Sequence, residues 1–550
     1  MKKFFTLLLA MSLMLMTACG NEADSKTLRV MLGSNVVSLD SAHATDVVSF
    51  EVIADCIDGL LQLDSNGNAI PAIAESYDIS EDGKTYTFHL RDAKWSNGEP
   101  VTAEDFVFAW RRHCAEGEEY AYVMGNTVAC VKNADAVIKG ADPSTLGISA
   151  PDAKTFVVEL EAPVSYFPSL MAFPTFYPIN EKFFNGLEKG SYGTSPSTFL
   201  SNGAFVMENY LPGAASVIMK KNSSYWDAEN IKLENLHYQV VASSDNALTA
   251  FRNNSLDLVS INGNQVEFAK SDEQLYKKLQ TIPTGALSYI TFNQDPKNHH
   301  AGALSNVNLR LAISNSVDRD SLVNNYIMNG AQATYTAIPI DFAPNAKTGK
   351  FFSEDQNKYS EYVGFNPEKA KNYLAQAKSE LGRDTFNLTL IYANDAGDMT
   401  VKLIQAVKSQ VENTLDGVTL DLQPMTKAEY FDKITTNNFD IAVTSWVPDY
   451  DDPMAFFTLW TTSGSEVTEH WSNAEYDRII DECTTGSLAA NYEARWNALY
   501  DAEKILLENA VIAPLYTGAE AYLTADRVSG IDFHVAGIKR VFKSVALKNN

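Results

Sequence analysis

The chain has 550 residues, of which 43 are Lys or Arg and 69 are Asp or Glu, so its formal charge is −26. This acidity excludes proteins that bind nucleic acid or anionic lipid over their whole surface. Hydrophobic residues make up 45% and charged residues 20%, which is typical of a globular protein. Five cysteines are too few for a disulfide scaffold. The length predicts about three or four domain-sized units.

The first residues are typical of a targeting segment rather than of a folded domain. A basic start followed by an apolar run predicts a signal peptide over residues 1–18. Met16-Thr17-Ala18-Cys19 resembles a bacterial lipoprotein signal, in which Cys19 is acylated and becomes the first mature residue. Residues 19–26 then form a lipidated tether; the alternative is an ordinary signal peptide with an incidental cysteine. The sequence has no second apolar run of about 20 residues, so no membrane span is predicted.

Three elements are predicted in the first quarter of the chain. Leu28–Leu32 is a plausible first strand. Lys84–Leu90 alternates apolar and polar side chains, which predicts a half-buried strand. Thr102 precedes an acidic first turn, so we expect a helix that begins there and runs toward Arg112.

The region 385–445 has the clearest pattern in the chain. It alternates strand, helix, strand, helix and strand, with strands at Phe386–Tyr392, Val418–Leu422 and Phe439–Ser445. Ile404, Val407, Val411 and Leu415 recur at helical spacing between the first two strands. This alternation predicts a parallel sheet covered by helices. Because ligands of such sheets bind beyond the carboxyl ends of strands, the segment after Ser445 is a candidate site.

Short segments that carry a family resemblance lie along almost the whole chain. They are Ser38-Leu39-Asp40, Asp58–Leu61, Pro71–Tyr77, Tyr86–Phe106, Asn202–Phe205, Asn222–Trp226, Arg310–Ile313 with Asp318-Arg319, and Trp446–Pro453. Taken together and in this order, they resemble the bacterial extracellular solute-binding proteins of family 5, which bind oligopeptides and dipeptides.

The resemblance implies an α/β, two-lobed periplasmic-binding-protein-like fold of the class II type. Lobe one is expected to combine residues 27–60, 191–284 and 505–550, with an extra domain, 61–190, inserted in it. Lobe two is expected to span 285–504, and the lobes would close around a ligand by a hinge motion.

The resemblance also implies a function. The chain would capture oligopeptides and deliver them to an ABC permease whose ATPase is a separate subunit, and no GxxxxGK[ST] motif occurs in the chain itself. We expect an exported monomer with no nucleic-acid partner. A lipid anchor would hold it at the outer face of the cell membrane, or in the periplasm of a cell with two membranes.

The resemblance assigns ligand contacts to particular residues. A peptide offers an ammonium group at one end and backbone amides that can pair as an added strand. Asp449 matches the position that binds the ammonium group, which makes a strong, directional contact. Further ligand contacts are implied for Ser445 and Val447 with the peptide backbone, Thr45 and Val47 as an opposing backbone clamp, Tyr120 (or Tyr122) as a nearby aromatic, and Trp446 and Tyr450 within the same motif.

The acidic segments around Asp449 and Asp64 allow other interpretations. Asp449 in isolation is typical of a solvated loop. A calcium loop at 449–460 would need Gly and Glu where the chain has Met454 and Trp460. Asp64–Asn68 has Ala69 at the glycine position of such a loop, so it predicts a β-hairpin turn instead. No metal or cofactor is expected.

The residue that would hold the ligand's carboxylate is not evident. The strand before Asp449 reads Ile441–Thr444 without a cation, and Ala393–Thr400 has no His, Lys or Arg. Arg310 and Arg319 are expected to stabilise helix ends instead. Longer peptides, held mainly by backbone and N-terminus, would suit such a site.

Cysteines and enzyme motifs complete the expectations. An exported chain can form disulfides, and Cys114–Cys130 is the most local pairing, with buried thiols as the equal alternative. No GxSxG, CxxC or HExxH motif occurs, so we do not expect an enzyme or a metal site. A secreted hydrolase, a receptor for haem, nickel or a sugar, and a signalling-peptide receptor remain as alternatives.

Overall fold

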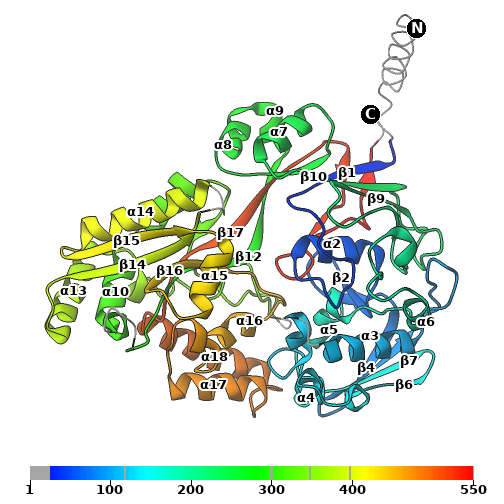
Figure 1. The fold of residues 1–550 in the computed structure, drawn as a ribbon, viewed down its shortest axis with the longest axis horizontal. Helices are drawn as coiled ribbons and strands as arrows, with labels where there is room; N and C mark the ends of the chain where they lie inside the picture. The colour runs from blue at the N-terminus through cyan, green and yellow to red at the C-terminus, as the bar shows by residue number, and fades with distance from the viewer. Residues whose placement is uncertain (1–24, 117–118, 298–301, 346–347, 395–397, 549–550) are drawn as a thin grey trace, which may run out of the picture.

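The computed structural model describes residues 25–116, 119–297, 302–345, 348–394 and 398–548. The predicted signal peptide, Cys19 and most of the tether 19–26 lie outside these ranges. None of the described helices is long and apolar enough to cross a membrane. Figure 1 shows two lobes that lie side by side and are joined by long strands, which agrees with the expected two-lobed α/β fold.

One sheet of eleven strands runs through both lobes. Its order is β15-β14-β16-β12-β17-β11-β1-β10-β9-β8, with β13 (Gln332–Ala333) paired to β17. At its centre, β12 (Leu279–Phe292) and β17 (Ile512–Thr524) pair antiparallel along their length. One end of β17 pairs with β11 (Leu258–Ile261), and the other end of β12 pairs with β16 (Ile441–Trp446). These two long strands therefore connect the lobes.

Lobe two contains the predicted alternation of strands and helices. β14 (Phe386–Ala393), α14 (Asp398–Thr414), β15 (Val418–Met425), α15 (Lys427–Thr435) and β16 follow one another, and β14 pairs in parallel with both β15 and β16. The predicted apolar stripe of Ile404, Val407, Val411 and Leu415 is buried in this lobe's core. The parallel sheet is thus confirmed, with β16 starting two residues later than predicted.

Further helices cover this lobe: α10 (Val307–Asn315), α11 (Arg319–Leu322), α12 (Ser360–Val363), α13 (Pro367–Leu381), α16 (Met454–Phe457), α17 (Ala474–Thr484) and α18 (Tyr492–Glu508). Arg310 donates hydrogen bonds to the carbonyls of Asn509 and Ala510, just beyond the end of α18. Arg319 donates to those of Ser314 and Val317, around the end of α10. Cations are favourable at helix C-termini, so both arginines act as predicted.

Lobe one holds the other half of the sheet. β1 (Thr27–Leu32), the predicted first strand, pairs in parallel with β10 (Asn235–Val240), and β9 (Ser216–Lys221) and β8 (Phe205–Asn209) follow antiparallel. Its helices are α2 (Val47–Cys56), α7 (Ser244–Arg252), α8 (Asn264–Ser271) and α9 (Glu273–Tyr276). Short C-terminal strands β18 (Val528–Ser529), β19 (Asp532–Phe533), β20 (Arg540–Val541) and β21 (Ala546–Leu547) complete it.

Buried ion pairs join distant parts of the chain within lobe one. The Asp257 carboxylate accepts hydrogen bonds from Arg29 and Arg527, and Glu51 pairs with Arg540. Charges this deeply buried are stable only when their partners stay in place. The start, the middle and the end of the chain therefore form one body.

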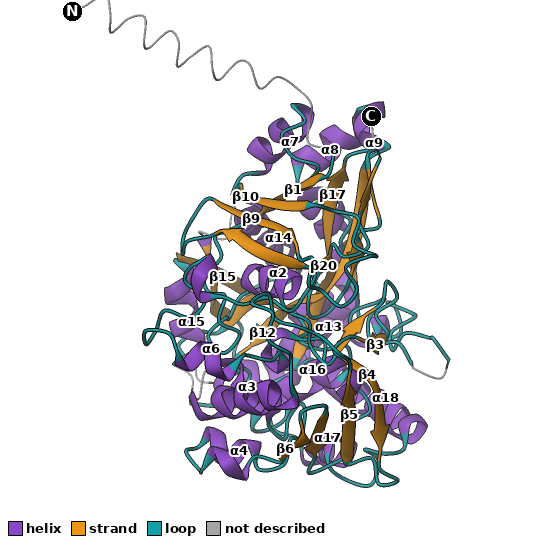
Figure 2. Ribbon diagram, turned by 90° about the vertical axis from the view of Figure 1, so that its right-hand side faces the viewer, coloured by secondary structure: helices purple, strands orange, loops and turns teal. Residues whose placement is uncertain are grey.

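The region expected as an inserted domain has its own four-stranded sheet, and its buried side chains are continuous with the core of lobe one. The order is β4 (Ala74–Ile79), β5 (Thr85–Leu90), β7 (Thr155–Glu159) and β6 (Ile148–Asp152), all antiparallel. Its helices are α3 (Ala103–Glu116), α4 (Ala134–Ile138), α5 (Phe167–Leu170) and α6 (Glu181–Asn185). Figure 2 shows this sheet at the opposite end of the molecule from β1 and β10.

Three local predictions in this region are confirmed. In β5, Tyr86, Phe88 and Leu90 are buried while the intervening residues are partly exposed. The segment Asp64–Asn68 is the turn of the hairpin between β2 (Leu61–Leu63) and β3 (Ala69–Pro71). The helix predicted after Thr102 begins at Ala103 and runs four residues beyond Arg112.

The predicted domain boundaries fall at a strand irregularity, at the start of a strand and inside a helix. The boundary at 284/285 coincides with an irregularity in β12, between Pro283 and Leu287, at the junction of the lobes. The boundary at 60/61 falls where β2 begins. The boundary at 504/505 falls inside α18, which ends at Glu508.

The cysteines are thiols, not a disulfide. Cys56, Cys114, Cys130 and Cys483, the four within the described ranges, are all free and buried. The Sγ of Cys114 lies 3.3 Å from the Met124 sulfur, and the Sγ of Cys130 donates to the Asn126 carbonyl at 3.2 Å. Burial raises the pKa of both thiols to about 12. The Cys114–Cys130 pairing is therefore replaced by its alternative, buried thiols that each have a separate contact.

Candidate functional site

Asp449 lies at the boundary between lobe two and the inserted domain. It follows β16, beyond the carboxyl end of the strand. The hydroxyls of Tyr120 and Tyr122, on the 3-10 helix Glu119–Met124 of the inserted domain, both donate to its carboxylate, that of Tyr120 at 3.4 Å. The sequence left open which tyrosine is near the ligand site, and the structure brings both to Asp449.

The electrostatic state of Asp449 is unusual for a carboxylate at such a boundary. Burial raises its pKa, and the hydrogen bonds from Tyr122 and Tyr120 oppose that rise. It has no ion-pair partner among the described residues. A partly buried anion held by neutral donors gains strongly from a cation of matching geometry. The site is therefore suited to an ammonium group.

The strand that leads to Asp449 has an open edge. On one side β16 pairs with β12 as far as Trp446, but on the other side β14 pairs with only Ile441 and Ala442 within the described part of the chain. The Val443 carbonyl accepts a hydrogen bond from the Tyr430 hydroxyl at 3.2 Å. Backbone groups alternate between the two edges of a strand. Ser445 and Val447 therefore present their backbone groups to the same edge as Val443.

The side chains of this segment are held by their own lobe. The Ser445 and Ser288 hydroxyls form a hydrogen bond between β16 and β12. The Trp446 indole donates to the Ala455 carbonyl at 2.9 Å, which fixes the turn that follows. The backbone edge that could receive an extended peptide is thus rigid before any ligand arrives.

The opposing residues of lobe one, Thr45 and Val47, lie at the start of a helix. Asp46 caps α2 by accepting from the Ser49 amide, so Val47 is the first residue of a helix and Thr45 precedes it. A helix start presents backbone N–H groups that the helix itself does not use. Phe50, one turn on, meets the Tyr120 ring edge-on at 5.1 Å. This places the start of α2 beside the tyrosines of Asp449.

Three exposed apolar side chains surround this region. Val47 is 38% exposed, Tyr122 40% and Val447 40%, although all three are large and hydrophobic. They come from lobe one, the inserted domain and lobe two. Large apolar groups that gather near a buried charge are typical of a binding surface.

Tyr450 has a structural position rather than an exposed one. Its ring stacks on that of Tyr166, with centroids 4.7 Å apart and planes 16° apart. Because Tyr166 belongs to the inserted domain, this pair joins it to lobe two. Such stacked pairs contribute about 0.5–1.5 kcal/mol beyond the area that they bury.

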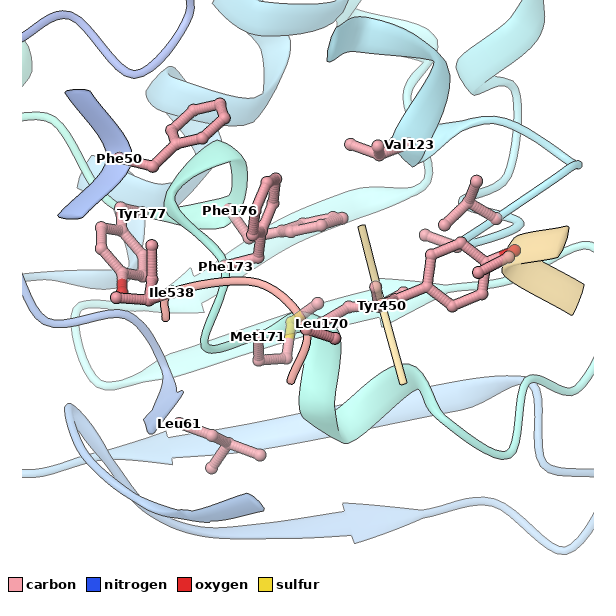
Figure 3. Close-up of a cluster of buried hydrophobic side chains, with 14 of the residues drawn as sticks. Phe50, Leu61, Val123, Leu170, Met171, Phe173, Phe176, Tyr177, Tyr450 and Ile538 are labelled. Carbon is pink, nitrogen blue, oxygen red and sulfur yellow. The ribbon is translucent and has the colours of Figure 1, made fainter. Parts of the chain in front are cut away.

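A cavity of about 740 Å³ adjoins Asp449 and Tyr450. Its walls come from the β2–β3 hairpin and α5 of the inserted domain, from the segment 341–351 of lobe two, and from the C-terminal segment 533–543. Its apolar side includes Leu170, Phe173, Tyr177, Tyr450 and Ile538 (Figure 3). Ser445, Val447, Thr45 and Val47 do not line it, so the cavity and the open strand edge meet at Asp449.

Sequence reasoning missed the C-terminal wall and Tyr166. Their segments have no periodic or motif signal, and they reach the site only through the tertiary fold. Among the described residues, no group of three or more His, Cys, Asp and Glu could hold a metal ion.

Known proteins share both the sequence and the fold. A dipeptide-binding protein of Lactococcus lactis is 29% identical over 98% of each chain, and the oligopeptide-binding protein OppA of Bacillus subtilis is 30% identical over 96% of each. The solved structure of Listeria monocytogenes OppA bound to peptide superimposes with a TM-score of 0.77 at 28% identity, covering 96% of this chain and 99% of that one.

The family profile described as bacterial extracellular solute-binding proteins, family 5, middle region, matches residues 68–467. That span includes most of the inserted domain, the lobe-connecting strand β12, the open edge of β16 and Asp449. The chain therefore belongs to the family 5 bacterial extracellular solute-binding proteins.

Proposed function

We propose that the chain is the substrate-binding lipoprotein of a peptide ABC transporter. It captures oligopeptides between its lobes outside the cytoplasm and delivers them, chemically unchanged, to a membrane permease. Cys19 anchors it to the membrane through acyl chains, and it acts as a monomer. The names of its relatives, which include dipeptide-binding and oligopeptide-binding proteins, support this ligand class.

One observation carries the proposal. Asp449 is a partly buried carboxylate whose donors are the two neutral hydroxyls of Tyr120 and Tyr122, next to a strand edge with open backbone groups. A peptide supplies both missing partners, because its ammonium group matches Asp449 and its backbone can extend the sheet. Because these contacts involve only the ammonium group and the backbone of the peptide, they suit a receptor that binds peptides of many sequences.

The test is calorimetric binding of a pentapeptide and of the same peptide with an acetylated N-terminus. Acetylation removes the ammonium charge, and Asp449→Ala removes its partner. We expect each change alone to weaken binding by about 2–5 kcal/mol, the loss typical of a buried charge pair. We expect acetylation to cost little more in the Asp449→Ala protein, because the two changes remove the same contact.

Asp384→Ala, at an exposed carboxylate before β14, is the matched control and should bind like the wild type. Equal affinity for the free and acetylated peptides would exclude Asp449 as the ammonium site. Mass spectrometry of the recovered peptide separates a receptor, which returns it intact, from the alternative of a secreted hydrolase. Export and anchoring are tested by labelling cells with radioactive palmitate, which should mark the wild type and leave Cys19→Ala unlabelled.

The alternative of a receptor for haem or nickel has less support. The described residues offer no metal-binding group, and Asp449 matches a cationic organic ligand. Nutritional and signalling peptides share the chemistry of Asp449 and the open edge, so the proposal covers both.

A further inference from the structure

The cavity beside Asp449 is larger than an ammonium group needs. Its volume of about 740 Å³ falls within the range of about 300–1,000 Å³ that is common for small-molecule sites. The carboxylates of Asp449 and Asp451 belong to the same lining. A ligand anchored at Asp449 therefore has space for a further group within reach.

One side of this cavity is apolar and aromatic. Leu170, Phe173 and Tyr177 line it together with Tyr450, whose ring is fixed by its stack on Tyr166 (Figure 3). Such a wall suits an aliphatic chain, and an aromatic face also attracts a cation.

Asp451 supplies an uncompensated negative charge to the same space. Its carboxylate accepts a hydrogen bond from the Ala343 amide at 2.8 Å, and the described residues give it no ion-pair partner. Burial raises its pKa to about 6. Two neighbouring charged residues, by contrast, do have ion-pair partners. Asp452 pairs with Arg495, and Lys543 pairs with Asp58.

His534 is a second polar group on the cavity lining that lacks a partner. It is only 6% exposed, and its Nε2 has no hydrogen-bond partner among the described residues. Burial lowers its pKa, so the ring is neutral near pH 7 and does not balance Asp451. Buried polar groups without partners are rare in native proteins, and a ligand that enters the cavity can satisfy them.

We infer that this cavity, which we call the Asp451 pocket, receives a Lys or Arg side chain of the bound peptide. The aliphatic stem of that side chain lies along the aromatic wall, and its cationic head pairs with Asp451. The inference rests on the proposed function, and it adds a preference for basic peptides to it. Because Asp449 adjoins the same pocket, the basic residue is the first of the peptide.

The test compares penta-alanine peptides that carry Lys at each position in turn with the same peptides carrying norleucine, which has an uncharged side chain of similar length. Calorimetry on the wild type should show binding at least about tenfold tighter for Lys than for norleucine at the first position, with smaller ratios further along. This comparison needs no variant, so a folding defect cannot obscure it.

Asp451→Asn then tests the residue. Asparagine still offers an oxygen to the Ala343 amide, so the change removes the charge and keeps the hydrogen bond. We expect the Lys and norleucine peptides to bind this variant equally, and Asp384→Asn to keep the wild-type ratio.

Two results would overturn the inference alone. These are equal affinity of the wild type for Lys and norleucine peptides, and an unchanged ratio in the Asp451→Asn protein. In both cases peptides still bind, and the proposed function stands. Failure of every peptide to bind the wild type would overturn the proposed function, and the inference with it.

Discussion

The two ends of the segment Asp449–Asp452 hold their carboxylates in opposite ways. Asp452 is 4% exposed and forms a two-pronged ion pair with Arg495, with N···O distances of 2.7 and 2.9 Å. It also accepts from the Met454 amide, which begins α16. Asp449, three residues earlier, meets two tyrosine hydroxyls and no cation within the described chain.

This difference separates a carboxylate that stabilises the fold from one that is available to bind a ligand. A buried carboxylate with a protein cation is neutralised, and removing either partner leaves a costly unpaired charge. A carboxylate held by neutral donors keeps its attraction for a cation from outside. Asp452 should therefore govern stability and Asp449 binding. The next four predictions test that division.

The largest effect on stability is expected from Arg495→Met. It leaves Asp452 buried without its cation, and breaking a buried pair in this way typically costs about 3–5 kcal/mol of unfolding free energy. Urea unfolding followed by circular dichroism measures that loss. Arg478→Met is the matched control, because Arg478 pairs with Glu475 on the surface of α17, with both side chains more than half exposed. It should cost less than about 1 kcal/mol.

Asp449→Asn is expected to have the reverse profile. It should weaken the binding of a free-amino peptide by about 2–5 kcal/mol and change the unfolding free energy by less than about 1 kcal/mol. The reason is that Asp449 has no ion-pair partner among the described residues to lose, and its partial burial already raises its pKa. Calorimetry and urea unfolding on one preparation give both numbers. A large loss of stability without a loss of affinity would place Asp449 in the same class as Asp452.

The pH dependence of the unfolding free energy should reveal the contribution of Asp451. Its pKa of about 6 in the folded protein lies above the ordinary value of 3.8, so protonation favours the folded state. Its stabilising contribution is complete below about pH 4 and is lost as the pH rises through 6. Relative to Asp451→Asn, the wild type should lose on the order of 2 kcal/mol between pH 4 and pH 7. Parallel stability curves for the two proteins would show that Asp451 is solvated.

Much of this site could be predicted from sequence because its residues belong to one continuous motif. Ser445 and Trp446 end a strand of the predicted parallel sheet and Val447 to Asp449 follow it, and parallel sheets bind ligands beyond their strand ends. The division of roles between Asp449 and Asp452 could not be predicted. It depends on Arg495, which lies 43 residues away on α18 and meets Asp452 only through the tertiary fold.

The opposing wall was harder to predict for a local reason. Thr45 and Val47 were expected as a backbone clamp with no stated conformation, and Asp46 caps a helix there by accepting from the Ser49 amide and hydroxyl. Asp followed three residues later by Ser is a weak helix signal, because the usual cap is reinforced by Glu or Gln at that place. The tertiary contact of Phe50 with Tyr120 completes the arrangement, and no sequence pattern reports it.

The smallest effect is expected from the tyrosines, which hold Asp449 without neutralising it. The Tyr122 hydroxyl is the closer donor and that of Tyr120 lies at 3.4 Å, so Tyr122→Phe should raise the pKa of Asp449 more than Tyr120→Phe does. We expect Tyr122→Phe to weaken peptide binding by about 1 kcal/mol at pH 7, with a smaller loss for Tyr120→Phe. Calorimetry at pH 7 measures both losses, and a larger loss for Tyr120→Phe than for Tyr122→Phe would contradict the assignment of Tyr122 as the stronger donor.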